Sequence, residues 1–587
     1  MKVLLLHPED EFLPAGPVSG WDLVVDLGRA PSSSYENWGR QAGCRVISLY
    51  EFAQEIGDLQ RVRELVLLGM GRMVDRWEID WWELLSLHVV PELLQLLLVE
   101  RLAKQLSPDC ELYSSRPDLR AAGLQVLLDV KVTNLEPRMQ ARVRSLRHYR
   151  DAFSNLDLGQ LTQVLHDKFD PEHAIRRMFS RKRAGSGQPV VLLPSAYINV
   201  SRTALAYAAL VPHCQFLLVC GRNSSQVKSL PANVRSTSLD AYFVPANKLE
   251  VASLLNRWSA LKAHLVAGVP EFAIADALGV LGQIPSLVRW GVALRDAWQQ
   301  VFATENVTAC LCADDSNPYT RIPLILAKHR GLPALTCHHG ALDSDVTLKT
   351  QYADFYLAKG EMERDYLLRF GKVVPERVVV GAPQLAKSSR SEPVVGAPDR
   401  AWLVFFTEPY QNFGWRPDEV YRELLPELSA VARNCGLKLV FKLHPFESVK
   451  GHRKLLLRYL PRDEARRVEI LAGPPSPQLW RKTRVAMTVQ STVALECRAQ
   501  GIPVFLCGWL RDAHTGYLRQ FERFGIGQVL ESPNRIDEIP RLLGKTGGLA
   551  QANLWQAIEP ETLRRLMAGT HPLSVPGPAI KAGVRHA

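Results

Sequence analysis

The residues best suited to chemistry follow short apolar runs in the second half of the chain. The run LKLVFKLHPFES places Lys442 inside a predicted strand and His444 and Pro445 at its end. Pro445 lacks an N–H and restricts the residue before it to an extended backbone. The imidazole of His444 is therefore expected to project over the edge of a sheet. As an imidazolium it would bind a phosphate, and a histidine that only closes a strand-helix turn is the alternative.

A second run, VAMTVQSTVALECRAQG, indicates a strand, a Ser-Thr pair and a helix. Ser491 or Thr492 is expected to cap the helix start, where hydroxyls and free N–H groups converge on a spot that fits an anion. Glu496 lies inside this helix and could reach a ribose hydroxyl, although the helix dipole alone also favours an acidic residue there. Thr407, after the run AWLVFF, is a further candidate phosphate contact, with loop capping as the alternative.

Two earlier strands end in groups that could act as a base. The run TACLCADD ends in Asp314 and Asp315, and LPALTCHHG ends in His338, His339 and Gly340. A base near an acceptor hydroxyl and anion-binding groups on another domain would together serve transfer from an activated donor. A turn histidine and an aspartate pair that caps a helix are the alternative.

A parallel sheet is needed to bring these strand ends together. From residue 190 onward, short apolar runs alternate with helical segments, which is typical of βαβ units. In such sheets, ligands bind beyond the carboxyl ends of the strands. We therefore predict an α/β protein with two Rossmann-like doubly wound domains, preceded by an N-terminal α/β extension of unknown role. The expected bounds are 1–180 for the extension, 190–385 and 400–570 for the two domains, and 571–587 for a tail.

Composition excludes several classes of protein. The 587 residues carry 71 Lys and Arg against 60 Asp and Glu, a formal net charge of +11, with 22% charged and 47% apolar residues. These values exclude disordered and coiled-coil proteins. No run reaches the roughly 20 predominantly apolar residues of a membrane-spanning helix. The 10 cysteines lack metal-like spacing. Without a P-loop, HExxH or GxSxG motif, P-loop enzymes, common zinc proteases and α/β-hydrolases are poor candidates.

The pairing of a Lys-Leu-His-Pro strand end with a downstream Ser-Thr helix start resembles glycosyltransferases of the two-domain GT-B architecture, over residues 190 to 530. It is most similar to bacterial surface-polymer enzymes: polysialyltransferases, capsule Kdo transferases and CDP-glycerol glycerophosphotransferases. In these families the His-Pro and Ser/Thr motifs hold the phosphates of the nucleotide. The resemblance carries that role over to His444, Pro445, Ser491 and Thr492.

The same resemblance implies a base on the first domain. His339 is the first choice, because the glycerophosphotransferases have a His-Gly pair at such a strand end, and Asp314 or Asp315 is the alternative. This chain has His-His-Gly where polysialyl- and Kdo-transferases have acidic residues near a glycine, so the base differs from theirs or lies elsewhere. The helix dipole, His444, Lys442 and hydroxyls would replace a metal, so neither a metal nor a cofactor is expected.

The activity implied is transfer of a sugar or related unit from a nucleotide-activated donor, CMP- or CDP-linked forms being candidates, to a surface or capsular polysaccharide or its lipid-linked acceptor. The expected location is the cytoplasm, with peripheral contact at the inner membrane as an option. The positive charge suits an anionic donor, an anionic polymer and that membrane, and nucleic acid is the least expected partner. A nucleotide-sugar 2-epimerase and a non-catalytic GT-B-like scaffold in polysaccharide assembly are the alternatives.

Overall fold

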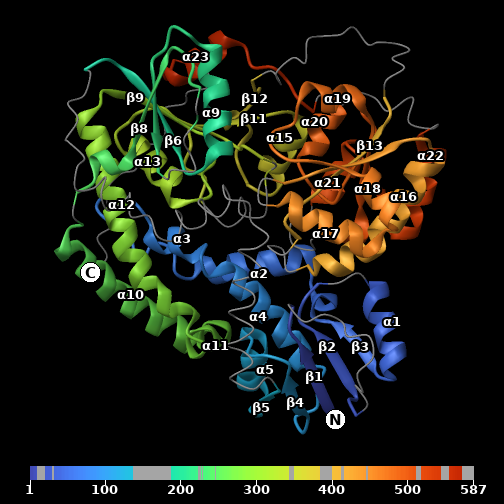
Figure 1. The fold of residues 1–587 in the computed structure, drawn as a ribbon. Coiled ribbons are helices and arrows are strands. Elements are labelled where there is room, and N and C mark those ends of the chain that lie inside the picture. Colours follow the sequence, from blue (N-terminus) through green and yellow to red (C-terminus); the bar gives the residue numbers. More distant parts are fainter. Residues whose placement is uncertain are drawn as a thin grey trace.

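The computed structural model contains three parallel β-sheets flanked by helices (Figure 1). Every pair of neighbouring strands in these sheets is parallel. The structure describes residues 1–8, 20–29, 32–135, 187–221, 227, 229–244, 246–340, 342, 350–383, 400–410, 415–444, 447–510, 517–543 and 554–570. Pro445 and the predicted tail, 571–587, therefore lie outside the described residues.

The N-terminal extension has a sheet of its own, in the order β3-β2-β1-β4-β5. Its strands are β1 (Lys2–Leu6), β2 (Leu23–Asp26), β3 (Arg45–Ser48), β4 (Glu111–Ser114) and β5 (Val132–Asn134). Its helices are α1 (Ser32–Ala42), α2 (Glu55–Leu67), α3 (Trp81–Ser86), α4 (Val90–Ala103) and α5 (Leu119–Leu128). The chain starts in the middle of the sheet, runs to one edge and returns to the other side, as in Rossmann-like folds.

The first Rossmann-like domain has a seven-stranded sheet in the order β12-β11-β10-β9-β6-β7-β8. Its strands are β6 (Val190–Ser195), β7 (Phe216–Cys220), β8 (Val234–Ser238), β9 (Val307–Cys312), β10 (Ala334–Cys337), β11 (Phe355–Ala358) and β12 (Val378–Val380). Its helices are α9 (Ile198–Leu210), α10 (Lys248–Gly268), α11 (Pro270–Ala277), α12 (Ile284–Thr304), α13 (Pro318–His329) and α15 (Glu361–Arg369).

The second Rossmann-like domain has a six-stranded sheet in the order β15-β14-β13-β16-β17-β18. Its strands are β13 (Trp402–Phe406), β14 (Lys438–Lys442), β15 (Glu469–Leu471), β16 (Thr483–Thr488), β17 (Val504–Cys507) and β18 (Gln528–Leu530). The helices that follow in sequence are α16 (Pro417–Asn434), α17 (Val449–Tyr459), α18 (Arg462–Arg467), α19 (Pro477–Lys482), α20 (Val493–Ala499), α21 (Tyr517–Arg523), α22 (Ile539–Leu543) and α23 (Pro560–Met567).

Both of these strand orders begin at the centre, run to one edge and then continue from the centre to the other, which is the doubly wound arrangement of nucleotide-binding folds. The predicted fold class, two Rossmann-like domains after an α/β extension, is therefore confirmed. The central strands are buried on both faces, as the burial of all five residues of β13 illustrates. This explains why they occur in the sequence as continuous apolar runs.

The helices of the extension share a core with the first Rossmann-like domain (Figure 1). Trp82 of α3 stacks on Trp258 of α10 with ring centroids 5.8 Å apart. Trp81 packs where α12 has Gly291, and a Cβ at Gly291 would lie 2.4 Å from the indole. The extension is thus fastened by buried aromatic area, the largest apolar contribution that single side chains make.

A buried ion pair also joins the extension to this domain. Arg321 of α13 has a fully buried side chain and pairs with Glu83 of α3, whose side chain is 2% exposed. Glu83 also accepts a hydrogen bond from the N–H of Thr350 at 2.9 Å, and Arg321 donates to the carbonyl of Thr350 at 2.8 Å. The other side of the guanidinium lies 3.4 Å from Asp315 Oδ2.

The extension contacts the second Rossmann-like domain as well. Arg416, which precedes α16, pairs with the buried Asp26 at the end of β2 and donates to the carbonyl of His7 at 2.8 Å. Its own N–H donates to the carbonyl of Arg29 at 2.8 Å. The side chain of Arg416 therefore lies against the carboxyl ends of β1 and β2 in the N-terminal sheet.

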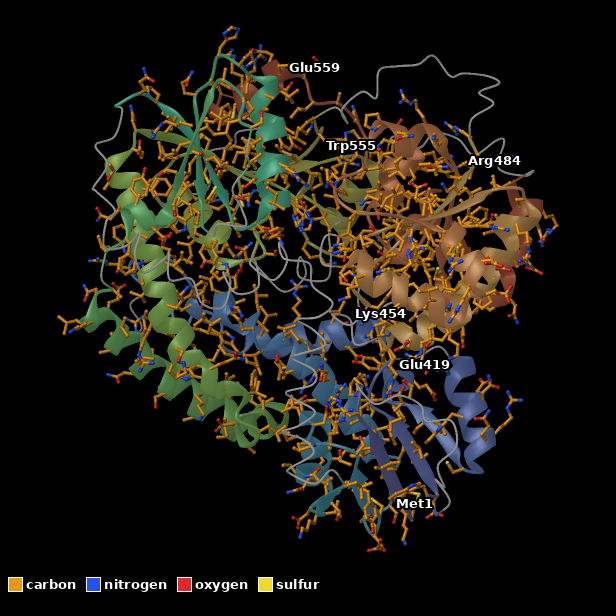
Figure 2. The ribbon with its side chains drawn as sticks, in the orientation of Figure 1. Met1, Glu419, Lys454, Arg484, Trp555 and Glu559 are labelled. Carbon is orange, nitrogen blue, oxygen red and sulfur yellow. The ribbon has the colours of Figure 1, made fainter. Side chains whose placement is uncertain are left out.

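The chain returns to the first Rossmann-like domain at its C-terminal end. Ala382, which leaves that domain, forms a parallel bridge with Ala557, and Trp555 Nε1 donates to the carbonyl of Pro383 at 2.9 Å. Figure 2 shows Trp555 between the two domains. Helix α23 then packs its Leu563, Leu566 and Met567 into the core of the first domain. The expectation that residues up to 570 belong to the second domain is wrong for this helix, because its apolar face covers the other sheet.

One finding bears on membranes. No single helix of the described residues is long and apolar enough to cross a bilayer, and α11 with Val280–Thr304 passes that test only as a pair bent by 71°.

Replacing Glu83 by Gln tests how firmly the extension is fastened. The substitution leaves the buried charge of Arg321 without its main partner, so we expect a loss of about 3 kcal/mol of stability. The measurement is the urea midpoint for unfolding of the first Rossmann-like domain. As a matched control, Glu100→Gln removes the exposed pair with Lys104 and is expected to cost under about 1 kcal/mol. Equal urea midpoints in the two variants would show that the ion pair of Glu83 with Arg321 does not stabilise the contact between the extension and the first domain.

Candidate functional site

In an open parallel sheet the ligand crevice lies where the strand order reverses, beyond the carboxyl ends of the strands. In the first Rossmann-like domain this point lies between β6 and β9. Tyr197 follows β6, Asp314 follows β9, and His339 follows β10. Three polar side chains from distant parts of the chain thus meet at one edge of the sheet.

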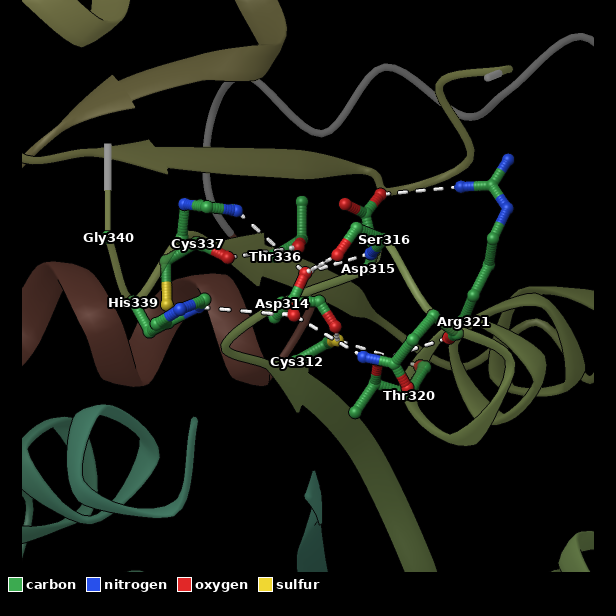
Figure 3. A network of polar contacts seen from close by, with 12 residues as sticks. Cys312, Asp314, Asp315, Ser316, Thr320, Arg321, Thr336, Cys337, His339 and Gly340 are labelled. Atoms are coloured by element: carbon green, nitrogen blue, oxygen red, sulfur yellow. Dashed lines mark hydrogen bonds and ion pairs between the residues drawn. The ribbon is translucent and has the colours of Figure 1, made fainter. Parts of the chain in front are cut away.

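Asp314 is fully buried and surrounded by hydrogen-bond donors (Figure 3). It accepts from Tyr197 Oη at 2.6 Å, from the N–H and the hydroxyl of Ser316, the former at 2.9 Å, and from Asn317 Nδ2 at 3.3 Å. A carboxylate has about four acceptor positions, so these donors occupy them. This arrangement stabilises the charged form of Asp314 and leaves it poorly placed to take a proton from a substrate.

His339 is the more accessible of the two groups. Its side chain is 20% exposed, against 1% for Asp314, and its Nδ1 lies 3.9 Å from Asp314 Oδ2. Both ring nitrogens lie close to Tyr197 Oη, at 3.2 and 3.3 Å. Burial lowers the pKa of His339; the charge of Asp314 opposes this effect and that of Lys359 adds to it. The imidazole is therefore neutral near pH 7, which is the form that accepts a proton.

The turn that carries His339 is fixed by a buried cation. Lys359 Nζ donates to the carbonyls of His338 at 2.6 Å and Gly340 at 2.7 Å, and it pairs with Glu363 at 2.6 Å. Because both carbonyls on either side of His339 are held, the backbone of the candidate base has little freedom.

The neighbouring Asp315 is directed elsewhere. It is 6% exposed as a residue and lies beside the buried guanidinium of Arg321. Its charge helps to balance that cation, so Asp315 has a structural role that competes with proton abstraction. Of the predicted bases, His339 is the one that the geometry leaves open to a substrate.

A metal at this place would meet an obstacle. Asp314, His338 and His339 offer ligand atoms that all lie within 4.8 Å of one another. Two histidines and a carboxylate suit divalent transition metals. A cation would, however, have to displace one of the donors that already occupy Asp314. The expectation that no metal is needed stays a prediction.

In the second Rossmann-like domain the reversal of strand order lies between β13 and β16. Glu408 follows β13 and is 6% exposed. It accepts hydrogen bonds from the hydroxyl of Thr488 at 3.1 Å and from the N–H of Gln490 at 2.7 Å. Burial raises the pKa of Glu408, and these hydrogen bonds oppose the rise. The turn that leads to Ser491 is thus built around a buried carboxylate.

The Ser-Thr pair is placed as predicted, at the start of a helix, but its capping differs from the expectation. Thr492 precedes α20 with nearly helical angles, φ −62° and ψ −14°, and its side chain makes no capping bond. Ser491 Oγ accepts from the N–H of Val493 at a long 3.4 Å. The Thr492 hydroxyl is therefore available to a ligand. The carboxyl of Glu496, in the same helix, makes no hydrogen bond to a described residue, and burial raises its pKa.

His444 differs from the prediction in charge. Burial, followed by the nearby charge of Lys442, lowers the pKa of His444 to about 4. The imidazole is therefore neutral near pH 7 and can offer an N–H to a phosphate but no full charge. The lowered pKa disfavours the imidazolium considered from the sequence, because a sequence does not show the burial that is the main cause of the shift. A phosphate contact by His444 stays a prediction.

Lys442 and Thr407 are both engaged within the protein. Lys442 Nζ donates to the carbonyls of Leu443 at 3.0 Å and Gly473 at 2.5 Å, and burial lowers its pKa. The Thr407 hydroxyl bonds to Glu447 and accepts from the N–H of His444 at 3.1 Å. Both residues therefore shape the turn at His444, and a direct phosphate contact would cost them these bonds.

The two turns of the site face one another across the domains. A Cβ built on Gly340, next to His339, would lie 3.9 Å from Cγ2 of Thr492. The candidate base and the available hydroxyl thus belong to different domains but meet at one place, as the strand-end rule predicts for a ligand held between two sheets.

Several residues that shape the site were not predicted from the sequence, among them Tyr197, Lys359 and Glu447. Tyr197 follows the first strand of its domain, next to the reversal of strand order, and inspection of that position would have found it. No sequence pattern points to Glu447, because it lies beyond the strand end. It accepts a hydrogen bond from the N–H of His444 at 3.1 Å and so influences the site through the backbone of that residue.

Comparisons with family models and with curated proteins found no match. Similar solved structures include a putative UDP-N-acetylglucosamine 2-epimerase from Listeria monocytogenes, at 11% identity and a TM-score of 0.40 over 65% of this chain and 96% of that one. S. aureus MnaA, solved with UDP, has 13% identity and a TM-score of 0.41 over 65% and 96%. The wall teichoic acid polymerase TagF has 10% identity and a TM-score of 0.37 over 74% and 97%. At these values the similarities decide no activity.

A pH experiment tests the carboxyl behind His444. Burial raises the pKa of Glu447 from 4.5 to about 7. The protonated carboxyl of Glu447 therefore adds to the free energy of unfolding. This contribution is complete below about pH 4.5 and is lost as the pH rises through about 7. In the wild type we expect the thermal unfolding midpoint to fall between about pH 5 and about pH 8. In Glu447→Gln this fall should be smaller, by an amount that corresponds to about 1 to 3 kcal/mol in the free energy of unfolding.

The control for this experiment is Glu469→Gln, which removes a partly exposed pair with Lys438. It is expected to leave the pH dependence as in the wild type. If Glu447→Gln also does so, the carboxyl is ionised throughout this range and the inferred shift of its pKa is refuted.

Proposed function

We propose that the protein is a glycosyltransferase that moves a sugar or a related unit from a nucleotide-activated donor to a hydroxyl of a surface or capsular polysaccharide acceptor. One observation carries this proposal: the turn with His339 faces the turn with Ser491 and Thr492, with 3.9 Å between a Cβ at Gly340 and Thr492 Cγ2. A neutral base on one domain and hydroxyls on the other are the groups that such a transfer needs.

In this scheme His339 takes the proton of the acceptor hydroxyl while the acceptor oxygen forms its bond to the transferred unit. The bond from that unit to the donor phosphate breaks, and its electron pair stays on the leaving nucleotide. The hydroxyls of Ser491 and Thr492 and an N–H of the neutral His444 donate hydrogen bonds to that phosphate. Asp314, 3.9 Å from His339 Nδ1, stabilises the imidazolium that forms.

The donor would bind the second Rossmann-like domain, and CMP- and CDP-linked donors are the first to test. The scheme uses no metal and no cofactor. The protein would act in the cytoplasm, with peripheral contact at the inner membrane where it meets a lipid-linked acceptor. Its net charge of +11 supports anionic partners of this kind.

A nucleotide-sugar 2-epimerase is the second candidate. Glu496 favours it, because an unpartnered carboxyl whose pKa is raised by burial suits proton transfer at a sugar carbon. An epimerase converts the donor sugar without any acceptor, so NMR of the donor incubated with the protein alone separates the two activities. A scaffold would change no sugar and bind no nucleotide.

Replacing His339 by Ala tests the base. We expect the thermal shift produced by the bound nucleotide to persist, while transfer falls about 10²- to 10⁴-fold, the usual effect of losing general-base catalysis. His213→Ala, at an exposed position of the same domain, serves as the control and is expected to keep full turnover. Full turnover in His339→Ala would move the base to Asp314 or Asp315.

The absence of a thermal shift with CMP-, CDP-, UDP- and GDP-linked donors would refute the transferase.

Replacing Thr492 by Val tests the phosphate contact. The side chains have the same shape, so only the hydroxyl is lost, and we expect the nucleotide dissociation constant to rise about fivefold to tenfold, for about 1 kcal/mol. Titration calorimetry measures this change. Thr308→Val, at an exposed position on β9, should leave the affinity unchanged. If both variants bind as the wild type does, Thr492 makes no contact with the donor.

A further inference from the structure

A groove outside the site lies between the extension and the first Rossmann-like domain. It has a volume of about 350 Å³ and is lined by the C-terminal half of α2, by the residues that follow α15, and by the segment that begins at Thr350. Among the described residues, its charged lining residues are Arg63, Lys372 and Arg377, and none of its described lining residues is acidic. The groove therefore presents one sign of charge.

The side chains of these three cations have no counter-ion among the described residues. None of the three forms an ion pair or a side-chain hydrogen bond there, whereas Arg61, on the same helix as Arg63, pairs with Glu271 at 2.6 Å. Like charges that converge without a partner repel one another, and an anion would relieve that repulsion. Arginine in particular binds phosphate and carboxylate groups through paired N–H donors.

The backbone of Lys372 supports a role for this groove. Its φ is 54°, in the left-handed region that only glycine adopts without cost. A residue with a long side chain costs about 1 kcal/mol there. Such strain is retained at functional sites more often than elsewhere.

The groove also has an apolar part. Leu67 and Val374 line it, and their exposed fractions are 51% and 50%. A ligand that covered both side chains would gain free energy in proportion to the apolar area removed from water, about 25 cal/mol per Å². The groove thus combines the recognition of an anionic group with that of an aliphatic chain.

One side chain lies between the groove and a cavity next to the candidate site. Gln351 lines the groove and also a small cavity that contains Asp315 and His338. A ligand in the groove would therefore lie one side chain away from the strand ends that carry the site.

We propose that this groove binds a phosphate ester of an aliphatic alcohol and thereby holds that part of the acceptor. The second half of this statement rests on the proposed function, and the first half does not. In this binding site the phosphate would contact the cations Arg63, Lys372 and Arg377, and the aliphatic chain would contact Leu67 and Val374.

Titration calorimetry with hexyl phosphate, inorganic phosphate and hexanol tests the ligand class on the full chain. We expect hexyl phosphate to bind at least tenfold more tightly than either of the others, and its affinity to fall as salt is added. Inorganic phosphate binding as tightly would overturn the apolar half of the proposal. Hexanol binding as tightly would overturn the anionic half.

Two variants test the residues. Lys372→Gly removes a cation together with its unfavourable backbone conformation, so we expect unchanged or higher thermal stability but at least fivefold weaker binding of hexyl phosphate. Leu67→Ser should weaken hexyl phosphate at least threefold and leave inorganic phosphate unchanged. Wild-type affinity in both variants would refute the site.

The controls change the same kinds of side chain, a cation and an exposed leucine, away from the groove. Arg484→Gln removes a cation at the outer edge of the second domain (Figure 2), and Leu249→Ser changes a side chain that is 84% exposed on α10. Neither should alter binding. Because these titrations need no turnover, a protein that binds hexyl phosphate in the groove but transfers nothing would refute the proposed function alone.

Discussion

The guanidinium of Arg321 is the group on which the arrangement of the first domain depends. It has no exposed surface, and its charge is balanced from one side by Glu83 of the extension and from the other by Asp315. Since an uncompensated buried charge costs several kcal/mol, the domain is expected to be less stable when Arg321 loses either partner. Asp315 adjoins Asp314, so the position of the candidate site is tied to a helix more than two hundred residues earlier in the chain. The extension is a structural part of the first domain.

In the second domain the buried ionisable groups are acidic, whereas Arg321 in the first domain is basic. Glu408 and Glu447 are buried carboxyl groups, and the charge of Glu408 adds to the burial that raises the pKa of Glu447. Each accepts the N–H of a turn residue, Gln490 in one case and His444 in the other. Polar groups that are buried and fully hydrogen-bonded specify one backbone geometry, because any other would leave them unsatisfied. The turn before Ser491 and the turn at His444 are therefore each held by a buried carboxyl group.

The sequence predicted the parts of the site that depend on local signals. Apolar runs followed by polar residues located His339, Asp314, Ser491 and Thr492 at strand ends, and the alternation of strands and helices predicted the fold. The rest depends on contacts between distant residues. The neutral state of His444 follows from its burial beside Lys442, and the pairing of Glu83 with Arg321 spans 238 residues. Neither leaves a periodic or compositional trace, since any buried position accepts such a pair only after the tertiary packing is in place.

The parallel bridge between Ala382 and Ala557 has a mechanical consequence. The Ala382 N–H donates to the carbonyl of Gln556 at 2.8 Å, and the Ile558 N–H donates to the carbonyl of Ala382 at 2.9 Å. These bonds join the residues at which the chain leaves the first Rossmann-like domain to the residues that lead back into α23. The point of departure and the point of return are therefore expected to move together, as one part of the first domain.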